Sequence, residues 1–439
     1  MRRVAIILIG ALIISALKTV PTAIASENEA IAISKNIQQR HMPHGTILDP
    51  VFKAADSDEI DYYARAGDSA IWTGHYLAAE AFRYRATTAP EALVNARSAL
   101  AGIRLLVDVT GNNLLARCLI PTNSPYAGKI IEEENRHGVY RSVLNGQEYF
   151  WIGNTSRDQY SGVFFGLGVA YDMIEDAETR AEISNLVTRL LDFLVSRNWI
   201  VTMPDGSIST IFTGHPDQRL SFLQVGRRVN PDRFGALYAD HRRQNYSEVI
   251  VPISFEVLDD HNSYFKFNLD TINLYNLIRL EDDSFYRDSY LGAYEVLRRT
   301  TDDHGNPHFN MIDYALRGQN SSRDAATREF LDQWLRRSRR DNLLDWRNDP
   351  RYPACAENRA CQPLPVADRI NTDFLWQRSP FLLFGGGTGK IETAGIDYIL
   401  PYWMARYYGV INRELNAPSR SPRPRKQLPS RPKRLIPEF

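Results

Sequence analysis

The sequence is poor in cysteine, has no excess of charge of either sign and contains no long apolar run after its first residues. Three of its 439 residues are cysteine, and 52 Lys and Arg residues balance 52 Asp and Glu residues. The zero net charge gives no indication of the basic surface that binds nucleic acids. Without a later apolar run of about 20 residues, we expect no membrane-spanning helix after the N-terminal segment.

Patterns of metal ligands are also lacking. His304 and His308 stand close together, but Gly305 and Pro307 break the helical register that would align them. No CxxC spacing accompanies the cysteines. We therefore expect neither a metal ion nor a cofactor. The content of 44% hydrophobic and 24% charged residues is that of a folded protein and excludes wholesale disorder.

The charges are distributed unevenly along the chain. Residues 1–25 join a basic start, an apolar run and a small-x-small site that ends at Ala25, which is the order of a secretory signal peptide. We expect cleavage there, rather than retention as an anchor, and a periplasmic or extracellular protein. Residues 413–439 are basic and rich in proline, which predicts a disordered tail. The first segment carries three cations and the tail a net charge of +6, which leaves residues 26–412 at −9.

The three cysteines divide into a pair and a single residue. Cys355 and Cys361 flank five residues in a proline-rich segment, a spacing that a disulfide can close. Exported proteins meet oxidising conditions, so we predict a disulfide between them. Cys118 remains, and we predict that it is buried rather than reactive.

Apolar residues recur mainly with helical spacing, and the alternation typical of strands is scarce. Short strands are predicted near 139–144 and 148–151, and 340–394 reads as a long irregular segment. Consecutive helices form hairpins that recur every 40–50 residues or so. We therefore predict an all-α protein with one domain over residues 26–412. The predicted helices cover residues 70–87, 90–109, 158–174, 177–197, 217–229, 232–257, 262–281, 283–301, 310–318, 323–339 and 395–410.

Three segments carry a resemblance to a known superfamily. They are residues 67–79 (GDSAIWTGHYLAA), residues 157–162 (RDQYSG) and residues 395–398 (GIDY). The chain resembles the (α/α) toroid proteins of the six-hairpin glycosidase superfamily over residues 45–410. The resemblance implies about six helical hairpins around a funnel, with carbohydrate as substrate and glycosidic bonds cleaved by hydrolysis or by β-elimination.

Asp68 and Asp158 are the leading catalytic candidates. Each stands at the start of a predicted helix, followed by aromatic or small residues on the same face. Glycoside hydrolysis needs one protonated carboxyl and one carboxylate, and a helix N-terminus favours the ionised form. The same position also suits an ordinary helix N-cap, so capping remains the alternative.

Further candidates for binding substrate surround this pair in sequence. Trp72 and His75 share a helical face with Asp68, and Arg157 and Tyr160 flank Asp158. Residues 371–380 form a polar and aromatic stretch whose Trp376, Gln377 and Arg378 suit sugar recognition. A core role is the alternative for His75, and loop packing is the alternative for the 371–380 stretch.

Several weaker possibilities complete the candidates. Tyr160 with His261 would suit a lyase or an epimerase, which needs a base and a proton donor beside a uronate. Glu392 and Asp397 are further carboxylates at the start of the last helix. Residues 385–390 (GGGTGK) lack the full phosphate-loop pattern, and we expect a flexible loop beside the cleft.

From the sequence we expect an exported glycoside hydrolase with paired carboxylates that acts on an oligo- or polysaccharide. The alternatives are a polysaccharide lyase or sugar epimerase, and a non-catalytic glycan-binding protein of the cell envelope. An acidic body with a basic tail makes nucleic acid an unsuitable partner. Oligomeric state and substrate identity do not follow from the sequence.

Overall fold

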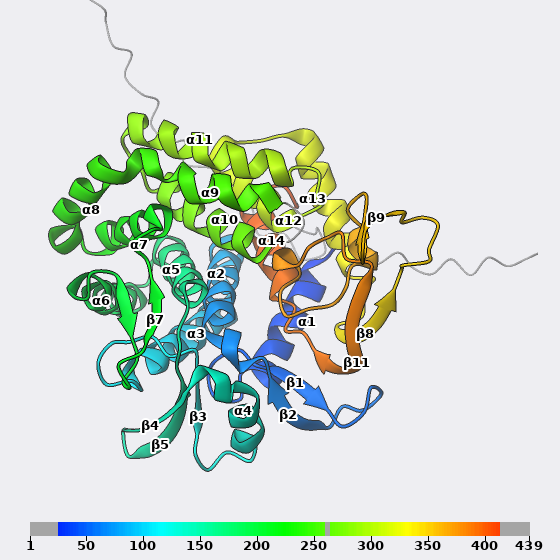
Figure 1. Cartoon of the computed structure of the whole chain (residues 1–439), viewed down its shortest axis with the longest axis horizontal. Coiled ribbons are helices and arrows are strands. Elements are labelled where there is room, and N and C mark those ends of the chain that lie inside the picture. The colour runs from blue at the N-terminus through cyan, green and yellow to red at the C-terminus, as the bar shows by residue number, and fades with distance from the viewer. Residues whose placement is uncertain (1–24, 260–263, 413–439) are drawn as a thin grey trace, which may run out of the picture.

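The computed structural model describes residues 25–259 and 264–412 (Figure 1). The predicted signal peptide up to residue 24, the predicted tail from residue 413 and His261 lie outside these residues. The chain is 58% helix and 14% strand, with 14 α-helices in the part described. The helical content confirms the main expectation, whereas several small sheets show that the protein is not all-α. No helix in the described part is long and apolar enough to span a membrane.

The helices lie within one or a few residues of most predicted ranges. They are α1 (Glu27–Asn36), α2 (Ser69–Thr87), α3 (Pro90–Asp108), α4 (Ala127–Glu134), α5 (Arg157–Met173), α6 (Ala177–Ser196), α7 (Pro216–Val229), α8 (Pro231–Asn245), α9 (Ile250–Glu256), α10 (Tyr264–Arg279), α11 (Ser284–Thr301), α12 (Pro307–Arg317), α13 (Ser321–Trp334) and α14 (Ile396–Tyr408). Proline at the first position of α3, α7, α8 and α12 matches its fixed φ and its missing N–H. The predicted helix over 232–257 is divided into α8 and α9.

Six helices contact one another in a closed circuit. In order these are α2, α5, α7, α10, α12 and α14, and α14 returns to α2. Each has a second helix packed against it: α3 on α2, α6 on α5, α8 on α7, α11 on α10, α13 on α12 and α1 on α14. Figure 1 shows α2 and α5 side by side near the centre of the molecule. The main apolar core lies within and between these helices.

The strands form four small sheets (Figure 1). The largest has the order β2-β1-β11-β8, the next β3-β5-β4, and β6-β7 and β9-β10 are two-stranded. The strands are β1 (Asp49–Phe52), β2 (Ile60–Ala64), β3 (Cys118–Pro121), β4 (Val139–Leu144), β5 (Gln147–Ile152), β6 (Ile200–Thr202), β7 (Ile208–Ile211), β8 (Arg340–Asp345), β9 (Ala354–Ala356), β10 (Arg359–Ala360) and β11 (Phe384–Glu392). β4 and β5 confirm the predicted strands near 139–144 and 148–151.

The glycine cluster at 385–390 is strand β11, so the predicted flexible loop is wrong. β11 pairs with β8 and, through Val51 opposite Ile391, with β1. Gly386 has a φ of 101°, and a Cβ at this residue would overlap the carbonyl oxygen of Asn342 on β8. Glycine is therefore required by close backbone approach within a strand. This pairing joins the chain near residue 50 to the chain near residue 390 and forms one side of the site described below.

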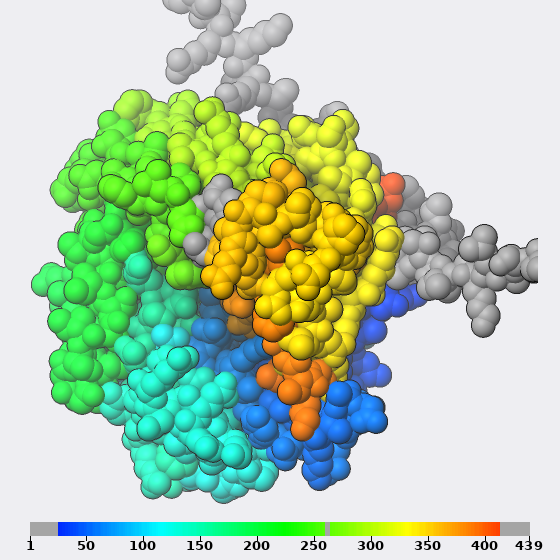
Figure 2. All heavy atoms as spheres, turned by 45° about the vertical axis from the view of Figure 1, so that its right-hand side comes forward, coloured from blue at the N-terminus to red at the C-terminus, as the bar shows by residue number. Residues whose placement is uncertain are grey.

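The predicted disulfide between Cys355 and Cys361 is present, and Cys118 is buried and free. The disulfide spans the β9–β10 hairpin. The hairpin and its surroundings have a small apolar cluster of their own, made of Ala360, Leu364 and Leu383. Figure 2 shows this yellow-to-orange part of the chain standing beside a hollow in the surface.

Candidate functional site

The site begins where α2 and α5 touch. A Cβ on Gly74 would overlap the carbonyl oxygen of Gly162, and a Cβ on Gly166 would overlap that of Gly74. The two backbones are therefore in direct contact, which only glycine permits. Residue 74 meets residues 162 and 166, and the Ile71 N–H donates to Gln159 Oε1 at 3.0 Å, so the helices run parallel. Their N-terminal ends, with Asp68 and Asp158, consequently lie side by side.

Asp68 immediately precedes α2 but makes no capping hydrogen bond, so the capping alternative does not explain this residue. Its Oδ1 accepts a hydrogen bond from Gln159 Nε2 at 3.1 Å and lies 3.9 Å from Arg117 Nη1. The side chain remains 38% exposed, and it lines a cavity. Partial burial and the charges of Asp373 and Asp158 raise the pKa of Asp68 to about 7, against the opposing effect of Arg117. Asp68 can therefore hold a proton near neutral pH.

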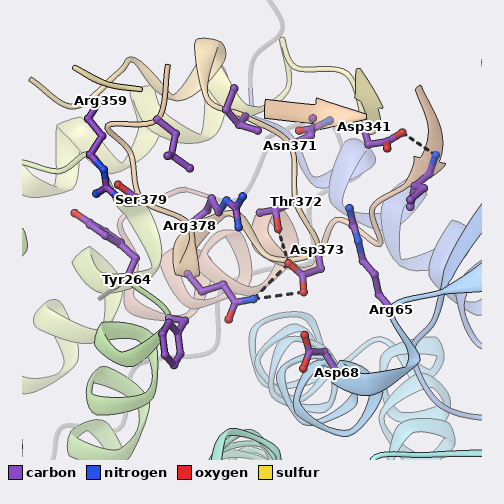
Figure 3. Close-up of a pocket in the computed structure, with 16 residues that line it drawn as sticks. Arg65, Asp68, Tyr264, Asp341, Arg359, Asn371, Thr372, Asp373, Arg378 and Ser379 are labelled. Carbon is purple, nitrogen blue, oxygen red and sulfur yellow. Dashed lines mark hydrogen bonds between the residues drawn. The ribbon is translucent and has the colours of Figure 1, made fainter. Parts of the chain in front are cut away.

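The carboxylate of Asp373 faces the same cavity (Figure 3). Its Oδ2 accepts from Trp72 Nε1 at 3.2 Å, and its Oδ1 accepts from Thr372 Oγ1 at 2.6 Å. The Phe374 N–H donates to Oδ1 at 3.0 Å, and Gln377 Nε2 reaches both oxygens. This set of donors matches a carboxylate that accepts at both oxygens. Asp373 thus complements a neighbouring carboxyl group that is protonated.

The cavity has a volume of about 750 Å³. It lies between the N-terminal ends of α2 and α10, strand β11 and the segment around η7 (Leu375–Gln377). Its lining is mainly polar and charged, which suits a hydroxyl-rich ligand better than an apolar ligand. The lining residues are Arg65, Asp68, Tyr264, Phe265, Asp341, Arg359, Ile370, Asn371, Thr372, Asp373, Gln377, Arg378, Ser379, Leu382, Gly386 and Ile391.

Two aromatic residues at the start of α10 contribute an apolar patch to this lining. The hydroxyl group of Tyr264 hydrogen-bonds to His304 Nδ1, and its ring is almost wholly buried. The side chain of Phe265 is 50% exposed. An aromatic face beside polar groups is the arrangement that protein sites use for the apolar face of a sugar ring.

The predicted site residues differ in their position relative to the cavity. Asp68, Gln377 and Arg378 line the cavity, and Asp158 lies near enough to raise the pKa of Asp68 without lining the cavity itself. Trp72 lies just beneath the cavity, where its indole holds Asp373 and its ring stacks on Phe374 with centroids 4.9 Å apart.

Three predicted binding residues lie in the interior. His75 is fully buried among aromatic rings, and burial lowers its pKa to about 4. Tyr160 is fully buried, accepts the Leu115 N–H, and has a pKa far above its usual value because of burial. Trp376 is buried and donates from Nε1 to the carbonyl oxygen of Asp397. None of these three side chains lines the cavity.

Arg157 belongs to a second charged cluster, at the N-terminal ends of α5, α7 and α10. Burial raises the pKa of Asp217 to about 7 and that of Asp270 well above its usual range. Arg157 Nη1 and both carboxyl oxygens of Asp217 are buried and have no hydrogen-bond partner among the described residues. Lys266 Nζ lies 3.1 Å from Glu256 Oε2 in the same cluster. Arg157 therefore stabilises buried acids and does not line the cavity.

The remaining candidate carboxylates have structural partners. Although burial opposes ionisation, hydrogen bonding to His41 and the charge of Arg339 hold the pKa of Glu392 at about 2. Asp397 is buried and accepts the Leu375 N–H at 3.2 Å. Neither residue lines the cavity.

Four charged cavity residues were not singled out by the sequence analysis: Arg65, Asp341, Arg359 and Asp373. Asp373 lies within the polar and aromatic stretch 371–380, so its neighbourhood was recognised but its role as a carboxylate was not. Arg65 follows strand β2 and pairs with Asp49 at 2.8 Å. Asp341 lies on β8, which pairs with β11, and Arg359 lies on β10 opposite Leu382. Both residues face the cavity through these tertiary pairings.

No cluster of three or more His, Cys, Asp or Glu side chains with the geometry of a metal site occurs within residues 25–259 and 264–412. Comparison of the chain with protein-family models, with curated proteins and with solved structures finds no match.

Proposed function

We propose that this protein is an exported carbohydrate-active enzyme, a glycoside hydrolase in which Asp68 is the general acid and Asp373 the partner carboxylate. The observation that carries this proposal is the pairing of a carboxyl whose pKa is raised to about 7 with a second, hydrogen-bonded carboxylate in one cavity. Glycosidases divide their two carboxyl groups in this way, since one donates a proton and the other acts on water or on the sugar.

The chemistry follows from the two charge states. The Asp68 carboxyl donates its proton to the glycosidic oxygen while the bond from that oxygen to the anomeric carbon breaks. A water molecule attacks the anomeric carbon, and its proton passes to the Asp373 carboxylate. Asp158, which the sequence suggested as the second catalytic carboxylate, here acts through Asp68, because its charge helps to keep the Asp68 carboxyl protonated.

We propose also that the fold is an (α/α) toroid of six hairpins. This is supported by the closed circuit of α2, α5, α7, α10, α12 and α14, each with one helix packed outside it. The parallel N-terminal ends of α2 and α5 would then lie at the mouth of the ring. The four sheets would be elaborations of the loops between helices.

The proposal of export rests on two features. Residues 1–25 have the composition of a signal peptide. The disulfide between Cys355 and Cys361 suits an oxidising compartment.

The test is a cleavage assay on neutral and acidic oligosaccharides, with new reducing ends as the measured product. Asp68→Asn and Asp373→Asn should each abolish cleavage. Asp288→Asn, a change on the exposed face of α11, is the matched control and should retain full activity. Cleavage by either active-site variant at the wild-type rate would overturn the assignment. Glycan binding that persists in all variants without any product would identify a non-catalytic binding protein instead.

A lyase is the second candidate, and one observation favours it. Tyr264 lines the cavity, and its hydroxyl group hydrogen-bonds to His304 Nδ1, which makes a pair suited to proton transfer. The predicted lyase residue Tyr160 is buried away from the cavity. A product that absorbs in the ultraviolet through a new carbon–carbon double bond, lost in Tyr264→Phe but not in Asp68→Asn, would select the lyase over the hydrolase.

A further inference from the structure

We infer that the substrate of this site is an acidic sugar, and that its anionic group binds to Arg359 and Arg378. The inference rests on the proposed function, because it names the substrate class of the same cavity. Both side chains line the cavity, and Figure 3 shows Arg359 beside Tyr264 and Ser379 and Arg378 next to Thr372, both apart from Asp68. An anion held there leaves the adjoining glycosidic bond within the space next to the carboxyl pair.

Neither guanidinium group has an acidic partner among the residues that the structure describes. Arg378 follows η7 and is exposed to the cavity. Arg359 is half-buried, and its Nη1 is buried without a hydrogen-bond partner. Within residues 25–259 and 264–412, neither side chain has an ion pair or a hydrogen bond. A buried guanidinium nitrogen without an acceptor, as at Arg359 Nη1, is costly, and an anion in the cavity supplies the missing acceptor.

Nearby arginines show that pairing is the rule in this part of the chain. Arg347 Nη2 lies 2.7 Å from Asp345 Oδ2, and Arg351 Nη2 lies 2.7 Å from Asp349 Oδ2. Arg65, the third arginine of the cavity, is held by Asp49. Among the described residues, Arg359 and Arg378 have no such acidic partner, and both line the cavity. Their placement therefore points to a ligand and not to internal stabilisation.

The carboxylates of the cavity do not make a cationic ligand the better fit. Burial and the neighbouring carboxylates raise the pKa of Asp68 to about 7, which lowers its negative charge near neutral pH, and Asp373 is occupied by four donor groups. The buried carboxylate of Asp341 accepts the Ile391 N–H at 2.8 Å. A cationic ligand would find few unoccupied acceptors, whereas an anion finds two unoccupied guanidinium groups. A neutral glycan would leave both charges uncompensated.

The geometry of guanidinium favours a carboxylate, because its planar fork offers two parallel N–H donors to two oxygens. A uronic acid is therefore the expected sugar. A sulfated sugar presents the same negative charge and is the other source to be distinguished. One experiment tests both the uronic acid and the sulfated sugar, since in each case removal of the negative charge should weaken binding.

The experiment compares four oligosaccharides of one length: neutral, uronate-containing, methyl-esterified uronate and sulfated. Methyl esterification removes the charge and keeps the shape of the sugar. Arg359→Gln and Arg378→Gln should each raise KM for the uronate oligosaccharide by roughly 10- to 100-fold, with little change for the neutral one. Arg347→Gln removes an arginine of the same part of the chain that is paired outside the cavity, and should leave KM unchanged.

Binding measured with Asp68→Asn separates this inference from the proposed function. If that protein binds the uronate in preference to its methyl ester, and Arg378→Gln removes the preference, the anion site stands even where no glycan is cleaved. If the wild type cleaves neutral glycans and Arg359→Gln and Arg378→Gln have no effect on any acidic glycan, the hydrolase stands and the anion site is wrong. Stronger binding of the sulfated sugar would assign the site to sulfate.

Discussion

The amide of Gln159 joins Asp68 to the next helix of the circuit, since its Nε2 donates to Asp68 Oδ1 while its Oε1 accepts the Ile71 N–H. Gln159 is fully buried. It therefore fixes the orientation of the Asp68 carboxyl relative to α5. The glycine contacts between α2 and α5 fix the distance between the same two elements. The catalytic acid proposed here is thus positioned by backbone packing as well as by a side-chain hydrogen bond.

Replacement of the two cavity carboxylates should remove activity without unfolding the protein. Loss of a general acid or base typically costs 10²- to 10⁴-fold in rate, and we expect Asp68→Asn and Asp373→Asn to fall about in this range. The measurement is kcat/KM on the best oligosaccharide, together with the thermal midpoint. A midpoint that falls by many degrees together with the activity would show a structural role for the residue.

The activity should depend on pH through Asp68. As the general acid, Asp68 acts only when protonated, so kcat/KM should fall as the pH rises through about 7. Asp158→Asn removes a negative charge that raises this pKa, and the descending limb should move to lower pH. Asp288→Asn serves as the control and should leave the profile in place. An unshifted limb in Asp158→Asn would show that Asp158 does not act on the proton of Asp68.

The contact between α2 and α5 should not tolerate a single added methyl group. Gly74→Ala places a Cβ against the backbone of Gly162, which side-chain movement does not relieve. We expect a loss of about 3 kcal/mol in the free energy of unfolding. Gly292→Ala lies in α11 where a Cβ meets no atom within 4 Å. It should stabilise the protein by about 0.5–1 kcal/mol because alanine favours the helix. Urea unfolding of both variants makes the comparison.

The buried acid Asp217 should make the protein less stable as the pH rises. Its pKa is about 7 in the folded protein and 3.8 as the ordinary value, so between these limits the folded state keeps a proton that the unfolded state has released. The free energy of unfolding from this group therefore falls by about 1.4 kcal/mol per pH unit over that window and is level above pH 7. Asp217→Asn removes this dependence.

The measurement for Asp217 is the difference in unfolding free energy between Asp217→Asn and wild type across this window. The difference should move in favour of the variant as the pH rises. Asp288→Asn, on the exposed face of α11, should show a constant difference. A difference that stays level across this window would mean that Asp217 is ionised in the folded protein.

The helices were predictable because their apolar residues repeat locally, as in α3 and α6, whose observed ends differ from the predicted ranges by one residue. Strands β4 and β5 were predictable, whereas β8 and β11 were not, because the glycines of β11 and the aspartates of β8 hide the alternation of a strand. Asp68 was predictable from its place before α2. The proposed partner Asp373 could not be predicted. It accepts a hydrogen bond from Trp72, 301 residues away in the sequence, and only tertiary packing brings Asp373 and Trp72 together.

The disulfide hairpin of β9 and β10 has a consequence for how the protein can diversify. Arg359 sits between Cys355 and Cys361, on a hairpin with its own apolar support, whereas Asp68 and the glycine contacts belong to the helices. One arginine of the proposed anion site thus stands on a different part of the chain from the proposed carboxyl pair. Exchange of residues 354–361 for another hairpin is a route to new glycan preferences in which the helical scaffold and its carboxyl pair stay as they are.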